Sequence, residues 1–320
     1  MKISVLGCGR WGSFISWYLI NHGHEVIEWG RDNSPSFLTL KNEGKNEYIT
    51  LDKRIVLTDD LGSALDRSEI IILSISSQSL REFLTKIKNE YGFGDKTYVL
   101  CMKGLEEDTG KRLSEIAIDC GIDKNNVAVW LGPGHIQSFL AGHPNCMVID
   151  GYNKDLVAKL ADGFRSELIR FYYGDDIIGN EVGAAAKNVI GIAAGMLDGS
   201  GYSSLKGPLM ARGAREISRL IKAMGGNELS AFGLCHLGDY ETTLFSDYSN
   251  NRRYGINYIK GEKFDKLAEG VSTVKALKLL GEKYGVDLPI TCGVYSIIYE
   301  NACPKTVFKT IFSRSTRKEF

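Results

Sequence analysis

One lysine in this sequence stands where acid–base chemistry is expected. Lys187 is the only cation in the small and apolar stretch 181–198, which also contains Gly183, Gly191 and Gly195. Each glycine costs a helix roughly 1 kcal/mol relative to alanine, so we expect another backbone or a ligand to approach closely. Burial lowers a lysine pKa from about 10.4 toward the range of an acid–base catalyst. The alternative is a lysine that extends from the edge of a core helix into solvent.

Two clusters further along the chain carry polar groups that suit a substrate. Asp239, in Leu-Gly-Asp-Tyr at 237–240, offers a carboxylate that would orient Lys187 or a substrate hydroxyl. The stretch 249–255 places Ser249 at an expected helix start, where backbone N–H groups favour a phosphate. Arg252 and Arg253 in this stretch supply further donors or lie on a solvated face.

A glycine motif near the start indicates a dinucleotide site. Gly-Cys-Gly-Arg-Trp-Gly at 7–12 lies between an apolar strand candidate at 2–6 and an apolar helix candidate at 14–20. In this context Gly7 makes the tight turn, Gly9 admits the pyrophosphate, and Gly12 lets the helix pack closely on the strand. The alternative is a structural glycine turn in an α/β domain that binds no nucleotide.

The residues after the second strand bear on which cofactor binds. Strand 25–29 is followed by Gly30, Arg31 and Asp32, near the expected adenosine ribose. An arginine there can meet a 2′-phosphate in bidentate fashion, which slightly favours NADP, whereas Asp32 leaves NAD open. A solvated loop position is the other interpretation of Arg31. We therefore predict NAD or NADP as the cofactor.

Two later loops also follow strand candidates. Ser76, Ser77 and Ser79 either cap the next helix or contact the cofactor. Lys103 follows the strand at 98–101 and lies at the carboxyl edge of the sheet, where ligands bind in open α/β folds. A lysine there suits an anionic substrate such as a phosphate, unless it is only a surface residue before a turn.

The order of elements predicts an α/β fold with two domains. We predict strands over 2–6, 25–29, 55–57, 70–75, 98–101, 127–131, 147–149 and 170–172, with helices such as 79–89 and 111–120 between them. This alternation is typical of a doubly wound, largely parallel sheet. Helical periodicity then covers 181–197, 209–223, 228–232, 271–284 and 293–299. We expect a dinucleotide-binding Rossmann domain over 1–180 and a helical substrate and catalytic domain over 181–320, with 311–320 as a frayed terminus.

Composition excludes several other classes. The formal net charge of the 320 residues is zero, which argues against nucleic acid or an anionic membrane as partner. The seven cysteines form no C-x-x-C pair, so we expect reduced thiols, no metal site and a cytoplasmic location. A strand that begins at Lys2 leaves no room for a secretory leader. No apolar run reaches the ~18 residues of a membrane span, so we expect no membrane insertion.

Taken together, these pieces resemble the NAD(P)-dependent sn-glycerol-3-phosphate dehydrogenases of the soluble bacterial type. The matching motifs run through most of the chain: G-C-G-R-W-G at 7–12, S-Q-S-L-R at 77–81, K-G-L-E at 103–106, L-G-P at 131–133, K-N-V-I-G-I-A-A-G at 187–195, A-R-G at 211–213, L-G-D at 237–239, N-R-R-Y-G at 251–255, E-G at 269–270 and P-I-T at 289–291. The resemblance implies interconversion of sn-glycerol 3-phosphate and dihydroxyacetone phosphate, which supplies the phospholipid backbone. A small phosphorylated substrate is thus the expected partner, and a homodimer is the assembly to consider.

The resemblance also assigns site residues. It makes Lys187 the acid–base residue and lets Asp239 hold the substrate and Lys187. The implied substrate contacts are Lys103, Gly132, Gly134, Lys187, Asp239, Ser249, Asn250 and Asn251. The implied cofactor contacts are Gly7, Gly9, Arg10, Trp11, Gly12, Arg31, Lys103, Ile136, Asn250 and Glu269.

Two departures from the family pattern concern the substrate. The usual Ser-Arg-Asn triplet is Ser249-Asn250-Asn251 here, so the arginine that meets the substrate phosphate is missing unless Arg252 or Arg253 compensates. The usual Gly-Pro-Ser/Thr-Phe-Ala is Gly-Pro-Gly-His-Ile at 132–136. Two other functions therefore stay open: a dehydrogenase of the same fold with a different 2-hydroxy or 2-keto substrate, and a non-catalytic nucleotide sensor.

Overall fold

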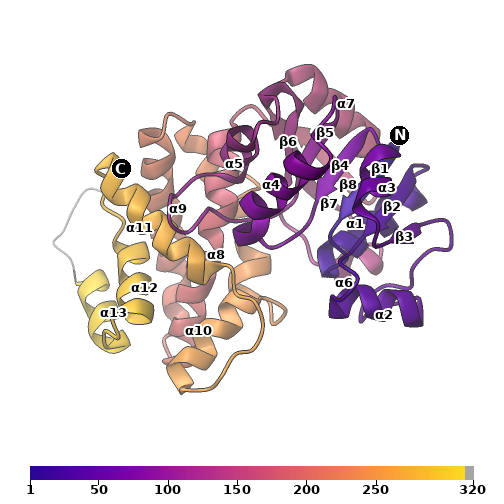
Figure 1. The fold of residues 1–320 in the computed structure, drawn as a ribbon. Coiled ribbons are helices and arrows are strands. Elements are labelled where there is room, and N and C mark those ends of the chain that lie inside the picture. Colours follow the sequence, from indigo (N-terminus) through magenta and orange to yellow (C-terminus); the bar gives the residue numbers. More distant parts are fainter. Residues whose placement is uncertain (314–320) are drawn as a thin grey trace. The chain divides into compact units, whose positions relative to one another are not determined.

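The computed structural model describes residues 1–313, and these divide into two compact units (Figure 1). The first unit contains Met1–Lys103 and Arg112–Ile177. The second contains Gly104–Lys111 and the chain from Ile178 onward. The expected doubly wound sheet and helical second part are both present, so the predicted fold class is confirmed.

The first unit is built on one eight-stranded sheet with the order β3-β2-β1-β4-β5-β6-β7-β8. Neighbouring strands are parallel except β6 and β7, which are antiparallel. The order changes direction at β1, whose carboxyl end is a ligand position in such sheets. The strands are β1 Lys2–Leu6, β2 Glu25–Trp29, β3 Val56–Thr58, β4 Ile70–Leu73, β5 Thr97–Leu100, β6 Val127–Leu131, β7 Asn145–Gly151 and β8 Ile169–Tyr173.

Helices connect these strands and bury the apolar faces of the sheet. Ile3 and Val5 of β1 pack in one cluster with Phe14 and Tyr18 of the next helix and with Trp130 of β6. Removing such apolar area from water is the main stabilising contribution to this unit. Its helices are α1 Arg10–Asn21, α2 Pro35–Glu43, α3 Leu61–Asp66, η1 Ser77–Ser79, α4 Leu80–Glu90, α5 Leu113–Cys120, η2 Lys124–Asn126, α6 Ile136–Leu140 and α7 Lys154–Phe164.

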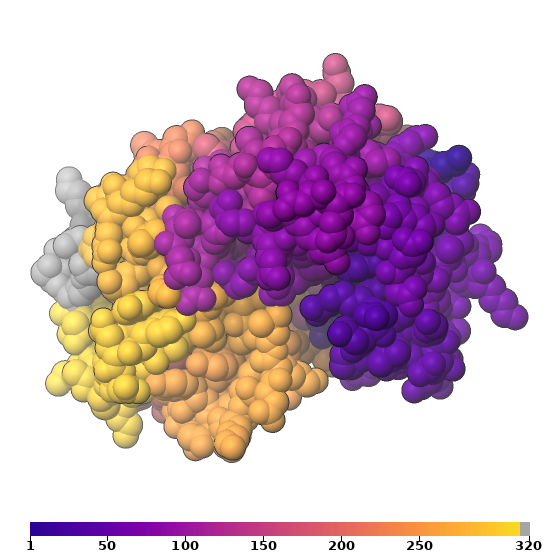
Figure 2. Space-filling view, viewed as in Figure 1, coloured from indigo at the N-terminus to yellow at the C-terminus, as the bar shows by residue number. Residues whose placement is uncertain are grey.

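The second unit is helical in the part that the structure describes. Its elements are α8 Ile177–Gly199, η3 Ser203–Leu205, α9 Lys206–Ala223, η4 Glu228–Phe232, η5 Leu237–Asp239, the π-helix η6 Glu241–Phe245, α10 Asn250–Lys260, α11 Gly270–Tyr284, α12 Pro289–Tyr299 and α13 Pro304–Phe312. Helices α10 to α13 form much of the visible face of this unit (Figure 2). Every stretch predicted as helical beyond 181 lies in one of these elements, although 228–232 is a 3₁₀ helix.

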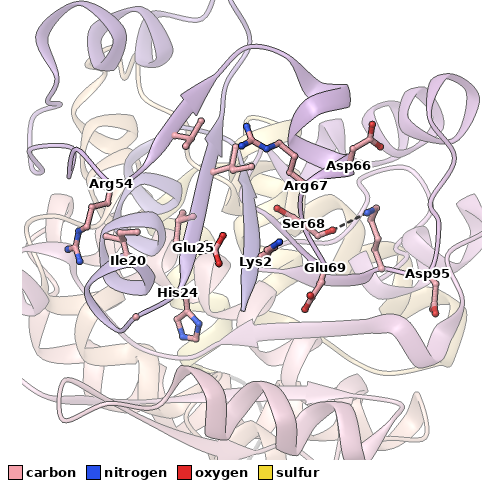
Figure 3. A pocket seen from close by; sticks show the side chains of 15 residues that line it. Lys2, Ile20, His24, Glu25, Arg54, Asp66, Arg67, Ser68, Glu69 and Asp95 are labelled. Atoms are coloured by element: carbon pink, nitrogen blue, oxygen red, sulfur yellow. Dashed lines mark hydrogen bonds between the residues drawn. The ribbon is translucent and has the colours of Figure 1, made fainter.

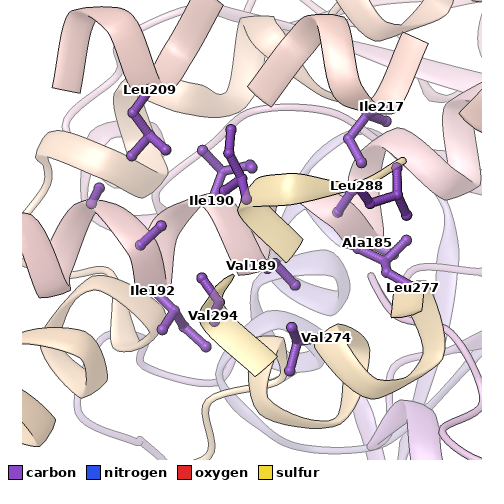
Figure 4. Packing of buried hydrophobic residues seen from close by; sticks show 14 of the residues in the cluster. Ala185, Val189, Ile190, Ile192, Leu209, Ile217, Val274, Leu277, Leu288 and Val294 are labelled. Carbon is purple, nitrogen blue, oxygen red and sulfur yellow. The ribbon is translucent and has the colours of Figure 1, made fainter. Parts of the chain in front are cut away.

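Helix α8 is the centre of the second unit. It is apolar around most of its circumference, and such a helix is stable only when neighbours cover all its faces. Figure 4 shows Val189 and Ile190 of α8 among Leu209, Val274 and Val294 of the surrounding helices.

The glycines of α8 permit close approach by another helix, as the sequence predicts. A Cβ atom at Gly195 would lie 1.9 Å from the carbonyl oxygen of Arg252 in α10. On the other side, a Cβ atom at Gly255 would lie 2.2 Å from the carbonyl oxygen of Ile192. The two backbones therefore touch, and this contact fixes the start of α10 relative to Lys187.

One short segment within residues 1–180 belongs to a different compact unit from the residues around it. The segment Gly104–Lys111 belongs to the second unit. Leu105 is fully buried in the core around α8, and Lys275 of α11 lies 3.2 Å from Glu107 and 3.1 Å from Asp108. These contacts tie the segment to the helices of the second unit.

The carboxyl-terminal prediction is only partly tested. Ile311 and Phe312 are the last residues of α13 and do not belong to a frayed tail. Residues 314–320 lie outside the described part of the chain. Within residues 1–313, none of the helices is both long and apolar enough to cross a bilayer.

Candidate functional site

The glycine motif forms an open cradle at the carboxyl end of β1. Gly7 has a φ of 119°, and a Cβ atom there would lie 2.2 Å from the carbonyl oxygen of Ser74. A Cβ atom at Gly12 would lie 1.8 Å from the carbonyl oxygen of Gly7. At Gly9, by contrast, no atom lies within 4 Å of the added Cβ. Gly7 and Gly12 thus serve tight packing, while Gly9 leaves space above the loop.

The amino end of α1 fits the phosphates of a dinucleotide. Gly9 is its N-cap and no side chain caps the first turn. Backbone N–H groups at such an end, with the helix dipole, attract anions. The residues present therefore fit a dinucleotide cofactor.

The side chains around this cradle have different environments. Arg10 is exposed, with its guanidinium carbon 5.5 Å from the centre of the Tyr48 ring. The ring of Trp11 lies 5.0 Å from that of Phe14 and is only partly buried. Arg31 is exposed just beyond β2, where the adenosine ribose is expected.

The acidic residue nearest the carboxyl end of β2, Glu28, is turned inward and is unavailable to a ribose. Glu28 is fully buried, and its Oε1 atom accepts a hydrogen bond of 2.7 Å from the hydroxyl of Ser13. Burial raises the pKa of Glu28 to about 7. An internal carboxyl group therefore lies beneath the amino end of α1.

Residues at the carboxyl ends of β5 and β6 come together in the first unit. The Nζ atom of Lys103 donates a hydrogen bond of 2.6 Å to the carbonyl oxygen of Gly132. Gly132 has a φ of 124°, which favours glycine. A Cβ atom at Gly134 would lie 2.4 Å from the Phe139 ring, and the side chain of Ile136 is fully buried. Ile136 is therefore completely covered by the surrounding protein in this structure.

In the second unit, Lys187 and Asp239 form a buried ion pair. The Nζ atom of Lys187 lies 2.7 Å from Oδ2 of Asp239, and their side chains are 9% and 1% exposed. The same Nζ donates a hydrogen bond of 2.9 Å to the hydroxyl of Thr243. The Thr243 hydroxyl in turn donates to the carbonyl oxygen of Asp239, at 2.7 Å. Lys187 is therefore paired inside the core and does not extend into solvent.

Thr243 is a site residue that the sequence analysis missed. It lies in the π-helix η6, which follows the short helix carrying Asp239. Single turns of π-helix are frequent at functional sites. Threonine at this spacing from an aspartate has no sequence signature of its own, so only the folded geometry shows its contact with Lys187.

The start of α10 is ordered by side-chain amides. Ser249 caps the helix by accepting from the backbone N–H of Arg252 at 3.3 Å. The Nδ2 atom of Asn251 donates to Oδ1 of Asn188 at 3.0 Å, and its Oδ1 accepts from the backbone N–H of Gly270 at 2.9 Å. Asn188, which directly follows Lys187, was also missed. This chain of bonds ties α8, α10 and α11 together.

Asn250 and Glu269 lie at the same end of the second unit. Asn250 is half-buried, and its side chain donates a hydrogen bond of 3.1 Å to the carbonyl oxygen of Leu267. Glu269 is half-buried and precedes α11, where its carbonyl oxygen accepts from the hydroxyls of Ser272 and Thr273.

The two arginines that follow position 250 have different surroundings. Arg252 is paired at 2.7 Å with both Asp198 and Asp247. Arg253 is exposed, with its guanidinium carbon 5.7 Å from the centre of the Phe264 ring. The guanidinium of Arg252 is thus shared between two carboxylates, which disfavours the alternative in which Arg252 replaces the missing arginine.

A separate pocket of about 810 Å³ lies at the other edge of the sheet (Figure 3). Lys2, Glu25 and Glu69 line it, and each lies at the amino end of a strand. In open α/β sheets ligands bind beyond the carboxyl ends. The pocket is therefore distinct from the glycine cradle, which lies at the carboxyl end of β1. In residues 1–313, no group of three or more His, Cys, Asp or Glu residues is arranged to hold a metal ion.

Comparison with known proteins covers nearly the whole chain. Two family models match it: the N-terminus of NAD-dependent glycerol-3-phosphate dehydrogenase over residues 2–157, and the C-terminus of the same enzyme over residues 176–309. Glycerol-3-phosphate dehydrogenase [NAD(P)+] of Thermoanaerobacter sp. (strain X514) is 33% identical over 331 residues, which is 100% of this chain and 99% of the relative. The enzyme of the same name from Fusobacterium nucleatum is 35% identical over 313 residues, which is 94% of this chain and 93% of the relative.

Solved structures agree with this result. The crystal structure of glycerol-3-phosphate dehydrogenase from Coxiella burnetii superposes with a TM-score of 0.89 at 25% identity, covering 98% of this chain and 99% of the other. The similarity includes the helical second unit as well as the nucleotide-binding sheet.

Proposed function

The chain belongs to the NAD-dependent glycerol-3-phosphate dehydrogenase family, and we propose that it interconverts sn-glycerol 3-phosphate and dihydroxyacetone phosphate. The observation that carries this proposal is the buried pairing of Lys187 with Asp239 and Thr243. A lysine held in this way can exchange a proton with a substrate oxygen. Its relatives are named NAD(P)+ enzymes, so the proposed cofactor is NAD or NADP.

The first unit would hold the cofactor. We assign the pyrophosphate to the backbone of Gly7, Gly9 and Gly12, with Arg10 and Trp11 beside it. Arg31 would meet the adenosine ribose or a 2′-phosphate. Further contacts are assigned to Lys103, Ile136, Asn250 and Glu269. A bound nicotinamide supplies hydride exchange with C2 of the substrate.

Lys187 would move the proton that accompanies this exchange. During reduction the ammonium donates a proton to the C2 oxygen, and during oxidation the amine takes it back from the C2 hydroxyl. The Asp239 carboxylate, 2.7 Å from Nζ, stabilises the ammonium. Thr243 accepts a second N–H and so fixes the direction of the amino group.

The phosphate of the substrate would be held largely by neutral groups in the second unit. We assign it to the capped start of α10, with Ser249, Asn250 and Asn251. The cation expected at position 250 is absent, and a charge-assisted hydrogen bond is worth about 1.5–3 kcal/mol. In the first unit, Lys103, Gly132 and Gly134 are the proposed substrate contacts. We therefore expect the phosphate group to bind less tightly than it would with an arginine at position 250.

Four broader assignments are also proposals. The product sn-glycerol 3-phosphate would serve phospholipid synthesis, and the protein would act in the cytoplasm as its family and thiols suggest. A homodimer is the proposed assembly, which analytical ultracentrifugation tests. The glycine cradle supports a domain for dinucleotide binding near 1–180, and the Lys187 group supports a catalytic domain near 181–320, with Gly104–Lys111 assigned to the latter.

The experiment that tests the function is oxidation of NADH and of NADPH by the protein on addition of dihydroxyacetone phosphate. Turnover with at least one cofactor is expected, and the two rates rank the cofactors. Tight NAD(P)H binding without turnover of this or any other ketone would instead favour the nucleotide sensor.

A further inference from the structure

Two buried polar residues flank the one-turn helix that carries Asp239. His236 is the residue before η5 and Tyr240 the residue after it. Both are fully buried. Polar side chains at such positions are costly unless each finds a partner, so their contacts call for an explanation.

Their hydrogen bonds specify one arrangement of protons. The Nδ1 atom of His236 lies 2.8 Å from the carbonyl oxygen of Gly183, and its Nε2 atom lies 2.7 Å from the hydroxyl of Tyr240. A carbonyl oxygen only accepts, so Nδ1 carries the hydrogen. In the neutral ring Nε2 is then the acceptor, and Tyr240 donates to it. The ring is thus fixed at both nitrogens.

Burial favours the neutral form of both residues. It lowers the pKa of His236 to about 4, although backbone hydrogen bonds at Gly183 and Gly213 and the charge of Asp239 oppose this shift; the charge of Lys187 adds to it. Burial also raises the pKa of Tyr240 well above its ordinary value, and the charge of Glu216 adds to this effect. The pair is neutral, so its contribution is geometric.

The two hydrogen bonds connect the elements that meet at Lys187. Gly183 lies one turn before Lys187 on α8. Tyr240 is the N-cap residue of η6, the π-helix that contains Thr243. A Cβ atom at Gly213 of α9 would lie only 3.1 Å from the Tyr240 hydroxyl, so the ring has no free space on that side.

Resting on the proposed function, we infer that His236 and Tyr240 are positioning residues for proton transfer. Their hydrogen bond closes the turn around Asp239, and the bond to Gly183 fixes that turn to α8. The Asp239 carboxylate and the Thr243 hydroxyl are thereby held against Lys187. Loosening the turn costs catalysis because a small displacement of a catalytic group is expensive.

Tyr240→Phe is the variant that tests this inference. It keeps the ring and removes only the hydroxyl that bonds to His236. The matched control is Tyr258→Phe, which removes another part-buried tyrosine hydroxyl of the second unit, bonded to the carbonyl oxygen of Ile297 at 2.6 Å. Both variants and the wild type are assayed with dihydroxyacetone phosphate and NAD(P)H, and their melting temperatures are measured alongside.

For Tyr240→Phe we expect kcat to fall about tenfold or more while KM for the ketone and Kd for NAD(P)H change by less than about twofold. The alkaline limb of the kcat profile for reduction should also move to lower pH, since a carboxylate held less firmly stabilises the Lys187 ammonium less. Tyr258→Phe should lose stability without either change. Wild-type kcat and pH profile in Tyr240→Phe would overturn the inference, whatever its melting temperature.

Two further measurements keep the inference testable if Tyr240→Phe does not fold. His236→Asn keeps a donor at the position of Nδ1 but ends the contact with Tyr240, and it should show the same loss of kcat. In the wild type, ¹⁵N spectra of the five histidines should show one ring with hydrogen on Nδ1 that stays neutral at pH 5. Hydrogen on Nε2 of that ring would contradict the geometry. Absence of ketone turnover by the wild type, in contrast, would count against the proposed function and not against this arrangement.

Discussion

The Nζ atom of Lys187 lies 2.7 Å from Oδ2 of Asp239, inside a core where both side chains are almost completely buried. An ion pair in such a place costs desolvation, and removing one partner leaves the other charge uncompensated. The pair therefore contributes little net stability to the fold, but it is well suited to holding a proton donor in one position. The catalytic proposal starts from this relationship.

The first prediction concerns Lys187 itself. Lys187→Ala should lower kcat for dihydroxyacetone phosphate by about 10²–10⁴-fold, the usual contribution of general acid–base catalysis. NAD(P)H binding should be nearly unchanged, because the glycine cradle is in the first unit. Steady-state kinetics and fluorescence titration measure the two effects. The control is Lys222→Ala, an exposed lysine paired with Glu228, and a loss below about tenfold in Lys187→Ala would remove Lys187 from the mechanism.

The second prediction concerns the neutral residue at the start of α10. Asn250→Arg should lower KM for dihydroxyacetone phosphate by roughly tenfold, because it adds a charge-assisted contact to a phosphate. Asn250→Gln, which adds length without charge, is the matched control and should not lower KM. An unchanged or weaker KM in Asn250→Arg would show that other groups already hold the phosphate.

The third prediction uses the buried carboxyl of Glu28. Its pKa is raised by burial from 4.5 to about 7, so the folded state holds a proton that the unfolded state releases. The contribution of Glu28 to stability is therefore full below pH 4.5 and is lost as pH rises through about 7. The loss amounts to about 3 kcal/mol.

Glu28→Gln should remove this pH dependence. Urea unfolding at pH 5 and pH 8 measures it, and the variant should be the more stable protein at pH 8. Glu25→Gln, at the exposed start of the same strand, is the control and should keep the wild-type difference. Equal pH dependence in Glu28→Gln and wild type would contradict the prediction.

The fourth prediction concerns the carboxylate that anchors α10. Asp198 accepts from Ser203 at 2.7 Å and Arg252 at 2.7 Å, and its Oδ1 lies 3.0 Å from Lys206. Burial raises the pKa of Asp198, but these hydrogen bonds outweigh burial and hold it below the usual value. Asp198→Asn would leave two cations without their shared partner.

We expect Asp198→Asn to lower the free energy of unfolding by about 3 kcal/mol, as for other buried ion pairs that lose one member. It should also raise KM for the phosphorylated ketone, since α10 carries the proposed phosphate contacts. Asp247→Asn removes the exposed partner of Arg252 and should cost less than about 1 kcal/mol. Equal losses in the two variants would show that Asp198 has no special role.

Much of the fold follows from local sequence patterns. Short apolar runs such as Val127–Leu131 are buried on both faces and could be placed within one or two residues. The antiparallel pairing of β6 with β7 could not, because strand direction depends on which neighbour completes the sheet. The grouping of Gly104–Lys111 with the second unit could not be predicted for a related reason: Leu105 finds its core partners far away along the chain.

For the candidate site, too, residue types could be recognised from the sequence, whereas contacts between distant segments could not. A lone lysine among small residues and a nearby Leu-Gly-Asp turn pointed to Lys187 and Asp239 from residue type alone. Thr243 depends on a π-helical turn, and the partners of Arg252 depend on how α8 meets α10. His236 and Tyr240 carry no pattern that separates them from ordinary core residues, so their hydrogen bond becomes visible only in the folded chain.

The most direct test of the account is kcat/KM of the wild-type protein for dihydroxyacetone phosphate, measured beside unphosphorylated dihydroxyacetone and a panel of 2-keto acids. We predict turnover of dihydroxyacetone phosphate and preference for it by a wide margin, even with Asn250 in place of a cation. Preference for a 2-keto acid, or for the ketone without its phosphate, would contradict it and assign this chain to a different substrate on the same fold.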